Sequence, residues 1–397
     1  MHEKKAPQLR FEGFDQDWEL RKLGEEVDIF DGTHQTPKYT KSGVKFVSVE
    51  NINTLETKKY ISNKAYEKEY SKKQAEKNDI LMTRIGDIGT AKVIENDEPL
   101  AYYVTLALFK PKEINSNFLV WIISSPEVQR NIWKRTLHIA FPKKINLGEI
   151  NQVELMIPKK EEQKKIGVFF KQLSDTITLH QRKIESLKQM KKGFLQQLFP
   201  EKGENIPKLR FTDFEGEWEQ RKLGDLSSVA MNKRIFKNQT SENGEVPFFK
   251  IGTFGSYPDA FISRELFEEY KSKYPYPEVG DILISASGSI GRTVVYQGED
   301  EYFQDSNIVW LKHNGRLDNK FLKQFYSIVK WQGLEGSTIK RLYNKNILDT
   351  NISVPALDEQ NKLGAFFEQL DDTTALHQRK LDQLNKLKTA FLQKMFI

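Results

Sequence analysis

The sequence predicts an α/β protein of the α+β kind, in which two strand-rich bodies alternate with two long coiled-coil helices. Two observations support this prediction. The word LHQRK occurs at residues 179–183 and again at 376–380, inside a repeat that runs through the whole chain. Strand-like and helix-like apolar patterns also occupy separate stretches of each copy. We therefore expect a pseudo-twofold molecule, and 397 residues are enough for two globular bodies with cores of their own.

The repeat is strongest at the two ends of each copy. Residues 7–27 align with 207–227, where 11 of 21 positions are identical, and residues 158–199 align with 355–396, where 22 of 42 are identical. The stretches between these anchors share little beyond the DIL segments described below. The frame therefore repeats while the bodies differ. The boundaries that we predict are a first body at 1–156, a first helix at 157–200, a linker at 201–206, a second body at 207–353 and a second helix at 354–397.

The bodies have the β-branched and aromatic content of strands, separated by Gly, Asn and Asp turns. The strands expected are VKFVSVENI (44–52), DILMTR (79–84) and YYVTLALFK (102–110), then VPFFKIGTF (246–254), DILISAS (281–287) and NIVWLK (307–312). A single helix is expected over FLVWIISSPEVQRNIW (118–133). GDIG and GSIG, which follow the two DIL strands, predict hairpin turns whose glycines have positive φ. The segment 228–278 of the second body offers no internal counterpart by sequence.

The two helical tails show a heptad pattern. With Ile177 at position a, apolar side chains recur at a and d over about five heptads, with Pro158 and Pro355 expected in the first helical turn. Two such helices in one chain predict an antiparallel pair. We favour a register-setting polar contact for the seam histidines over a metal site, which needs further donors. The seam residues predicted are Phe170, Leu173, Ile177, His180, Ile184, Leu187 and Phe194, with Phe367, Leu370, His377, Leu381, Leu384 and Phe391.

Composition excludes several classes of protein. The chain has no cysteine, so disulfides and cysteine-based metal sites are absent. No window reaches the ~18 apolar residues of a membrane span, and the start MHEKKAPQLRF lacks a signal-peptide core, which predicts a cytoplasmic protein. Residues 157–206 carry 11 basic against 6 acidic side chains, which accounts for +5 of the net charge of +6. Nucleic-acid binding therefore has to come from local patches.

Catalytic signatures are sparse. The sequence contains neither a G-x-x-x-x-G-K-[ST] phosphate loop nor a strand followed by G-x-G-x-x-G, and it lacks the N/D-P-P-F/Y motif of amino-methyltransferases. Asp259, Glu269 and Lys271 superficially fit the acidic–lysine spacing of some nucleases. ISRELFEEYKSKY, however, reads as an exposed charged helix rather than the apolar strand that such a site requires. We therefore expect no catalytic or metal-binding residue in this chain.

Basic and polar side chains gather in loops that suit DNA. Between Glu127 and Glu149 the chain has five basic residues and no acidic one, and Lys340-Arg341 lies 197 positions after Lys143-Lys144. Such side chains contact phosphates or read base edges, although ordinary solvated loops have a similar composition. The DNA contacts predicted are His34, Thr36, Lys38, Lys45, Arg84, Lys134, Arg135, Lys143 and Lys144 in the first body, and Lys233, Arg234, Lys237, Lys250, Arg292, Lys340, Arg341, Tyr343 and Lys345 in the second.

The ordered set of these motifs resembles the specificity subunits of type I restriction–modification systems. The resemblance covers the full length and is carried by LRFEGFDQDWELRKLGE, DGTHQTPKYTKSGVKFVSVENI, DILMTRIGDIG and the tail IPKKEEQKKIGVFFKQLSDTITLHQRKIESLKQMKKGFLQQLF with its second copy. The resemblance implies two target-recognition domains that each read half of a bipartite asymmetric DNA site. It also implies that the two helices separate these domains, set their spacing and dock the modification subunits.

The resemblance further implies which partners this chain has. Two modification subunits would bind S-adenosylmethionine and methylate adenine, and a restriction subunit using ATP and Mg²⁺ would translocate and cleave, so that the chain itself is non-catalytic and needs no cofactor. The readout loops carried over are 31–45 and 134–146, then 232–250 and 337–345. Two alternatives remain open at this stage. One is a stand-alone DNA-binding or scaffold protein, and the other is an autonomous nuclease built on Asp259, Glu269 and Lys271.

Overall fold

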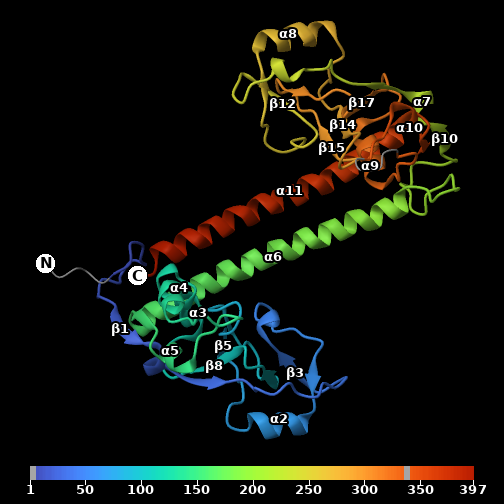
Figure 1. Ribbon diagram of the computed structural model, residues 1–397. Coiled ribbons are helices and arrows are strands. Elements are labelled where there is room, and N and C mark those ends of the chain that lie inside the picture. The colour runs from blue at the N-terminus through green and yellow to red at the C-terminus, as the bar shows by residue number, and fades with distance from the viewer. Residues whose placement is uncertain (1–5, 335–339) are drawn as a thin grey trace. The chain divides into compact units, whose positions relative to one another are not determined.

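The structure, a computed structural model, describes residues 6–334 and 340–397 (Figure 1). The chain forms two compact units. Unit 1 comprises the chain up to Arg182 together with Gln378–Ile397, and unit 2 comprises Lys183–His377. Each unit therefore combines one strand-rich body with portions of both long helices. Within the described ranges, no helix combines the length and the apolarity needed to cross a membrane.

Unit 1 is built on three small sheets. The largest is antiparallel and has the strand order β2-β8-β5-β6, the second has the order β4-β3-β7 with β3 and β7 parallel, and the third pairs β1 with β9. The strands are β1 (Glu19–Lys22), β2 (Val27–Asp31), β3 (Val44–Val47), β4 (Tyr60–Ile61), β5 (Ile80–Thr83), β6 (Ala91–Val93), β7 (Leu100–Tyr102), β8 (Leu106–Pro111) and β9 (Glu154–Ile157). The helices are α1 (Leu23–Glu26), η1 (Val49–Asn51), α2 (Asn63–Tyr70), α3 (Ser116–Ile123), α4 (Pro126–Lys134) and α5 (Leu147–Asn151).

Unit 2 repeats this topology strand for strand. Its sheets have the orders β11-β17-β14-β15, β13-β12-β16 and β10-β18, again with one parallel pair, β12 and β16. The strands are β10 (Glu219–Lys222), β11 (Ser228–Ala230), β12 (Val246–Phe249), β13 (Phe261–Ile262), β14 (Ile282–Ser285), β15 (Thr293–Val295), β16 (Tyr302–Phe303), β17 (Ile308–Lys312) and β18 (Asn351–Val354). The helices are α7 (Leu223–Leu226), η2 (Lys237–Gln239), α8 (Arg264–Lys273), α9 (Asn319–Ile328) and α10 (Asn344–Leu348).

The repeated topology extends further than the repeated sequence. The segment 228–278, which has no internal counterpart by sequence, forms β11, β12, β13 and α8 in the same order as β2, β3, β4 and α2. The segment therefore has a counterpart in topology, although it has none in sequence, because topology survives substitutions that preserve burial alone. The expected hairpin glycines are confirmed. Gly86 and Gly89 have φ of 88° and 94°, and Gly288 and Gly291 have φ of 63° and 83°, values that disfavour any residue with a Cβ.

Several elements expected from the sequence end elsewhere in the structure. The strands expected at 44–52 and 246–254 end at Val47 and Phe249. The strand expected at 102–110 is two strands, β7 and β8, because the chain turns at residues 103–105 and joins two different sheets. The helix expected at 118–133 is also two, since Ser125 caps α4 through a hydrogen bond from Val128 N, with Pro126 in the first turn. Pro158 and Pro355 precede the long helices, and the residues just before them form β9 and β18.

The two long helices are α6 (Lys160–Leu198) and α11 (Leu357–Lys394). In unit 1 the start of α6 packs against the end of α11, with the rings of Phe169 and Phe391 centred 5.1 Å apart. In unit 2 the end of α6 packs against the start of α11, with Phe194 and Phe366 also 5.1 Å apart. Both pairings run antiparallel, which confirms the fold class predicted.

The bodies are fastened to these helices by a repeated aromatic core. In unit 1 the buried Trp18 packs edge-on against Phe396 at the end of the chain, and in unit 2 Trp218 packs in the same way against Phe199 at the end of α6. Leu9 N donates to Lys394 O, as Leu209 N donates to Gln197 O, both at 2.9 Å. Each body therefore contacts the C-terminal end of one long helix, which is α11 in unit 1 and α6 in unit 2.

Candidate nucleic-acid interface

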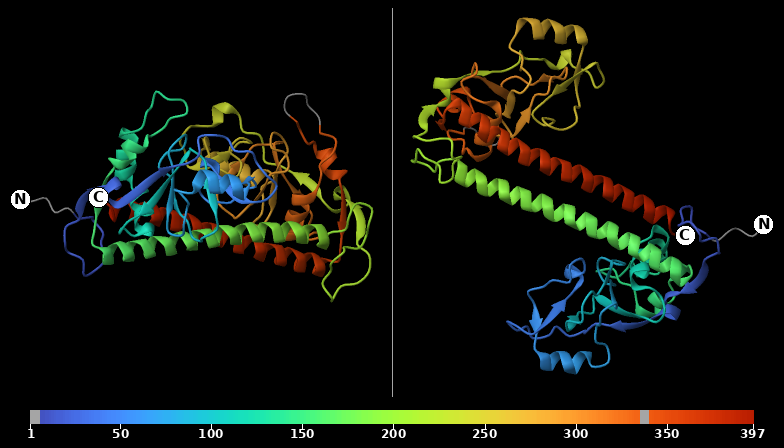
Figure 2. Two further views of the ribbon diagram at one scale, coloured as in Figure 1. Left: turned by 90° about the horizontal axis from the view of Figure 1, so that it is seen from below. Right: turned by 180° about the vertical axis from the view of Figure 1, so that it is seen from behind.

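Three loops of unit 1, far apart in the sequence, meet at one end of the strands of the main sheet. They are the segment after β2, the turn between β5 and β6, and the 137–144 loop, by which we mean the residues that project between α4 and α5 (Figure 2, left). Gly86 N donates to Lys143 O at 2.9 Å, and Ile145 N donates to Arg84 O at 2.9 Å. Bridges join Ile85 and Leu137 to Lys144. The main chain thus joins the β5–β6 turn to the 137–144 loop.

Arg84 holds this junction from inside. Its side chain is buried, at 7% exposure, and Nη1 donates to Asp31 Oδ1 at 2.7 Å while Nε donates to Ile145 O at 3.2 Å. The other oxygen of Asp31, Oδ2, accepts a hydrogen bond from His34 Nε2 at 2.7 Å. These hydrogen bonds engage the guanidinium away from solvent. They also position the segment after β2 against the 137–144 loop. The sequence predicts Arg84 as a DNA contact, and the structure buries its side chain against Asp31 and Ile145 O.

Unit 2 brings the corresponding loops together with different side chains. Leu342 N donates to Ala286 O at 2.8 Å, and Ser287 forms a bridge with Arg341, which reproduces the main-chain contacts of unit 1. Ala286 occupies the position that corresponds to Arg84 of unit 1. In unit 2 the guanidinium at the junction therefore belongs to another residue, Arg341. Arg341 Nη2 donates to Ser306 Oγ at 2.8 Å, and its guanidinium lies over the ring of Tyr343 at 5.9 Å.

The predicted basic residues fall into two groups. Some are engaged in ion pairs or hydrogen bonds with carboxylates and carbonyls, and the hydrogen bond to Glu56 raises the pKa of Lys45. This engaged group comprises Lys45 with Glu56, Arg135 with Glu149, Arg234 with Asp305, Lys250 with Asp259 and Arg292 with Gly255 O. The second group has no acidic partner within salt-bridge distance among the residues that the structure describes. It comprises Lys38, Lys134, Lys143, Lys144, Lys233, Lys237, Lys340 and Lys345.

Most of the remaining predicted contacts are exposed. His34, Thr36 and Tyr343 reach solvent, so their polar atoms are available to a ligand. Two basic side chains of the second group lie over rings, Lys143 over Trp133 at 4.5 Å and Lys233 over Tyr274 at 5.0 Å. Of the predicted loop 337–345, residues 337–339 lie outside the described residues.

Sequence reasoning missed Asp31, which anchors Arg84, and the aromatic platforms under the lysines. Trp133 belongs to the helix expected at 118–133, and the spacing of apolar residues in that helix does not show whether the ring is exposed or buried. A usable signal was present at Ile139 and Phe141, two large apolar residues inside a stretch with no acidic side chain. Both are fully exposed.

The predicted seam residues are all buried or partly buried, and two features differ from the heptad scheme. Phe170 packs on the body, stacked with Trp121 at 5.4 Å, while its neighbour Phe169 meets α11. Lys191 forms an ion pair with Asp371 of α11 at 2.6 Å, an interhelical contact that the apolar pattern does not indicate. The predicted residues that are fully buried are Phe170, Ile177, Ile184, Leu187, Phe367 and Leu381, and those partly buried are Leu173, His180, Phe194, Leu370, His377, Leu384 and Phe391.

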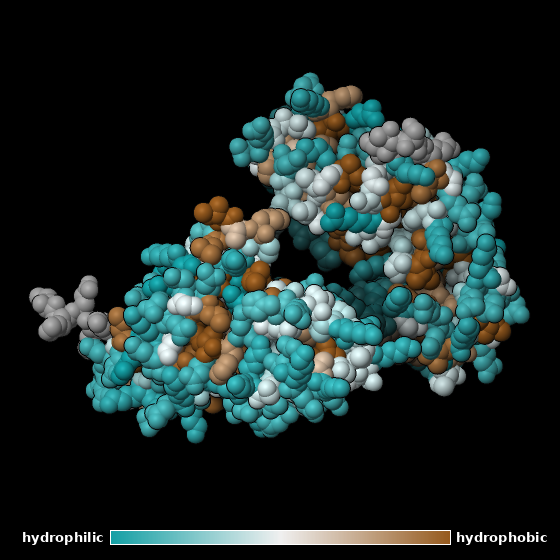
Figure 3. All heavy atoms as spheres, turned by 60° about the horizontal axis from the view of Figure 1, so that its bottom comes forward, coloured by the Kyte–Doolittle hydropathy of each residue, from teal (hydrophilic) through white to brown (hydrophobic). Residues whose placement is uncertain are grey.

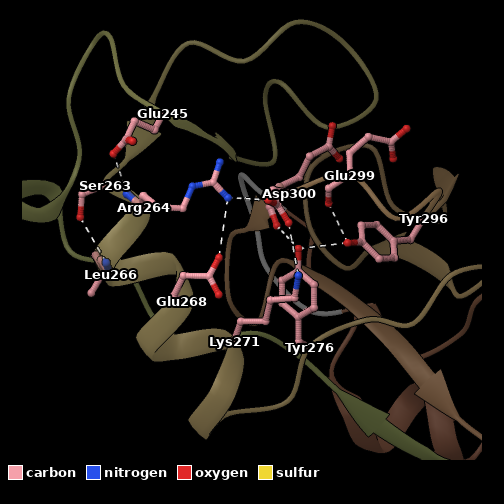
Figure 4. Close-up of polar contacts among 11 residues, drawn as sticks. Glu245, Ser263, Arg264, Leu266, Glu268, Lys271, Tyr276, Tyr296, Glu299 and Asp300 are labelled. Carbon is pink, nitrogen blue, oxygen red and sulfur yellow. Dashed lines mark hydrogen bonds and ion pairs between the residues drawn. The ribbon is translucent and has the colours of Figure 1, made fainter.

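The residues of the nuclease alternative belong to three separate ion pairs. Lys271 points toward Asp300, 3.3 Å away, next to Arg264, and these two cations lower the pKa of Asp300, Arg264 the more strongly (Figure 4). Glu269 pairs with Lys273 one turn along the exposed helix α8, and Asp259 pairs with Lys250. Across the described ranges, no group of three or more His, Asp or Glu side chains is arranged to hold a metal ion.

Comparison with known proteins identifies the family of this chain. The pattern of the type I restriction modification DNA specificity domain matches residues 15–189 and again 215–386, so that each match takes in one body and most of the helix after it. The chain is a member of the type I restriction–modification specificity-subunit family. The two matches also correspond to the two copies of the internal repeat.

Individual relatives agree with this membership. A Haemophilus influenzae protein named as a type I restriction enzyme specificity subunit, S.HindORF215P, is 56% identical over 153 residues, which cover 38% of this chain and 40% of that protein. The MjaX specificity subunit of Methanocaldococcus jannaschii is 25% identical over 405 residues, covering 94% and 91%. The solved S subunit from M. genitalium shares the fold, with a TM-score of 0.69 at 16% identity over 99% of both chains.

Proposed function

We propose that this specificity subunit reads a bipartite, asymmetric DNA site, with one half-site recognised by each body. The recognition domains in this proposal are residues 1–156 and 207–353. The observation that supports it is the pair of loop junctions. Both contain an equivalent main-chain hydrogen bond, Ile145 N to Arg84 O and Leu342 N to Ala286 O, and an equivalent bridge beside it, and each presents a different set of exposed side chains. A fixed scaffold with exchangeable loops is what two different half-sites require.

The free lysines support DNA as the ligand. Lys134, Lys143 and Lys144 gather at the junction of unit 1, and Lys340 and Lys345 lie at that of unit 2. Phosphate contacts of this kind supply most of the affinity and fix the register, while neighbouring polar side chains read base edges. His34 and Thr36 lie on the same junction in unit 1 and are exposed donors and acceptors suited to that reading.

The helices would set the distance between half-sites and dock two modification subunits. At 39 residues, α6 has a length of about 58 Å, ample for a spacer on the scale of a DNA turn. Exposed apolar side chains also recur 197 positions apart on the two helices, Leu179 with Leu376 and Met190 with Leu387. Two like surfaces in one chain suit two copies of one partner.

The chemistry would belong to the partners. In this proposal the methyltransferase subunits bind S-adenosylmethionine and transfer the methyl group to adenine, and this subunit only selects the site. The test is to purify the chain alone and together with the methyltransferase subunit, and to assay each for binding of S-adenosylmethionine, for methylation and for magnesium-dependent cleavage. We expect methylation of one bipartite motif by the complex only. Micromolar cofactor binding by the isolated chain, or cleavage lost in Glu269→Ala, contradicts the proposal.

A further inference from the structure

The 137–144 loop of unit 1 ends in an apolar tip. Ile139 and Phe141 are fully exposed, and Leu137 and the supporting Trp133 are about half exposed. Single exposed apolar residues are ordinary on a protein surface. Two fully exposed large ones at a projecting tip leave apolar area in water without any benefit to folding, which is typical of a surface that meets a partner. Apolar groups stand out in the space-filling view from an otherwise mostly hydrophilic surface (Figure 3).

The base of this loop is held firmly while the tip is free. Leu137 N donates to Lys144 O at 2.8 Å, which closes the loop, and Gly86 N donates to Lys143 O at 2.9 Å, which ties it to the β5–β6 turn. The ring of Trp133 packs against His138 at 4.4 Å on one limb and under Lys143 at 4.5 Å on the other. A projection braced in this way loses little conformational entropy when its tip is buried in a partner.

The charge around the tip favours a polyanion as the partner. The only charged side chains in sequence between Glu127 and Glu149 are basic, and Lys134, Lys143 and Lys144 have no acidic partner within the described part of the chain. The loop is also part of the junction that carries the candidate DNA contacts. An apolar tip flanked by cations matches duplex DNA, in which stacked bases lie between two rows of phosphates.

We propose that the 137–144 loop is a wedge that inserts the ring of Phe141, backed by Ile139, into a base step of the first half-site. The ring replaces part of the stacking that is lost when the step opens, while Lys143 and Lys144 contact phosphates beside it. This inference rests on the proposed function, since it requires that unit 1 binds DNA. It adds a shape-dependent component to the readout, because pyrimidine–purine steps open at least cost.

The wedge belongs to one half-site only. In the sequence, the positions 197 residues after Ile139 and Phe141 are occupied by Gly336 and Thr338. Neither residue has a ring or a large apolar side chain to insert. We therefore expect an opened base step in the half-site read by the first body and none at the corresponding place in the other.

The test uses the full chain assembled with its methyltransferase subunits and duplexes of the methylated motif carrying 2-aminopurine at successive positions. With the unaltered chain, fluorescence should rise at one step of the first half-site, in addition to any rise at the methylated adenine. Phe141→Ala should abolish the first signal, leave the second and weaken binding about five- to a hundredfold, the range for loss of one aromatic–base stack. Phe141→Trp should retain the signal.

Two controls make the result specific. Tyr257→Ala removes another exposed aromatic side chain, in unit 2, and should change neither the signal nor the affinity. Gel filtration of each variant with the methyltransferase in the absence of DNA tests whether the tip docks protein instead. Assembly that is lost in Phe141→Ala, or fluorescence that is unchanged by it, overturns the wedge. If the unaltered complex shows no sequence preference at all, the proposed function fails and the wedge fails with it.

Discussion

The two units share the contacts that fasten each body to the long helices, and they differ in the loops that gather at the junction of each body. Arg10 forms a bidentate ion pair with the buried Glu162, and Arg210 forms the same pair with the buried Glu359, all four contacts lying at 2.7–2.8 Å. At the loop junction, by contrast, only the main-chain hydrogen bonds are shared. The ion pair thus recurs between the two copies side chain by side chain, whereas the junction recurs only in its main-chain contacts and carries different side chains.

The helix ends show a second difference between the units. Lys191 and Lys388 occupy equivalent positions, 197 residues apart. In unit 2 Lys191 pairs with Asp371, which also accepts from Lys323. In unit 1 Lys388 lies over the ring of Trp121 at 4.7 Å instead, and burial, followed by repulsion from Lys92, lowers its pKa. Equivalent positions thus tolerate two different ways of accommodating a lysine.

The largest effect is expected from removing one half. Residues 1–203 keep the first body and α6 but lose α11, whose end packs on that body. The end of a second α6 offers almost the same surface, because Lys191, Phe194, Leu195, Leu198 and Phe199 correspond to Lys388, Phe391, Leu392, Met395 and Phe396. We expect a twofold dimer that, together with the methyltransferase subunits, directs methylation of a palindrome of the first half-site.

Light scattering gives the mass of this truncated chain, and sequencing of methylated DNA gives its motif when it is expressed with the methyltransferase. A truncated chain that stays monomeric, or one that still directs methylation of the asymmetric motif, would show that the halves are not interchangeable. Residues 204–397 provide the matched control and should give a palindrome of the second half-site.

A longer spacer should change the gap and leave both half-sites unchanged. Four residues inserted between Arg182 and Lys183, together with four between His377 and Gln378, fall at the boundaries of the units and leave each unit intact. The insertion adds about one helical turn, roughly 6 Å. Methylated-motif mapping should find one or two additional unspecified base pairs. An unchanged gap would mean that the helices do not act as a ruler, and a single insertion serves as the misaligned control.

Loss of Arg84 should affect only one half-site. Arg84→Ala leaves Asp31 without its buried partner and frees the first loop from the third, at a cost of about 3 kcal/mol in unfolding free energy. Discrimination against substitutions in the first half-site should fall, and that in the second should persist. Competition binding with singly substituted sites measures both. Equal losses in the two half-sites would contradict the positioning role.

The free lysines should affect affinity without affecting sequence preference. Replacing Lys143 and Lys144 by Ala should weaken binding of the assembled complex to all sequences about equally. The slope of log K against log salt should fall in magnitude by roughly one to two units, because up to two phosphate contacts are lost. Titrations at several salt concentrations measure it. Lys45→Ala, which removes an ion-paired lysine, should leave the slope unchanged.

The smallest effects distinguish the two equivalent lysines. Lys388→Met removes a partly buried charge and should leave stability at pH 7 unchanged or slightly higher, whereas Lys191→Met breaks an ion pair and should lower it by about 1 kcal/mol. Because the folded-state pKa of Lys388 is lowered, the unfolded chain binds more protons between that value and ~10.4, and stability should rise with pH there. In urea denaturation at pH 8 and pH 10, the Lys388→Met chain should not show this rise in unfolding free energy. A rise that persists in the variant would come from another titrating group.

Much of the frame could be predicted from the sequence, and much of the site could not. The antiparallel helices and the hairpin glycines follow from periodicity and from positions such as Gly86, where backbone sterics dictate the residue type. The sequence predicts Arg84 as a DNA contact although its side chain is buried, because composition does not reveal which side of a strand end is buried. The exposed Phe141 was missed for the converse reason, since an apolar residue in a loop is more often covered than bare.

The central claim is that each body selects one half of a single DNA site. The most direct measurement is a genome-wide map of methyladenine in cells that carry the gene and in cells that lack it. We predict one asymmetric motif with two specified parts and a fixed gap, present only in cells with the gene and changed in its first part alone by Arg84→Ala. A contiguous motif, or methylation that is indifferent to the gene, would contradict the claim.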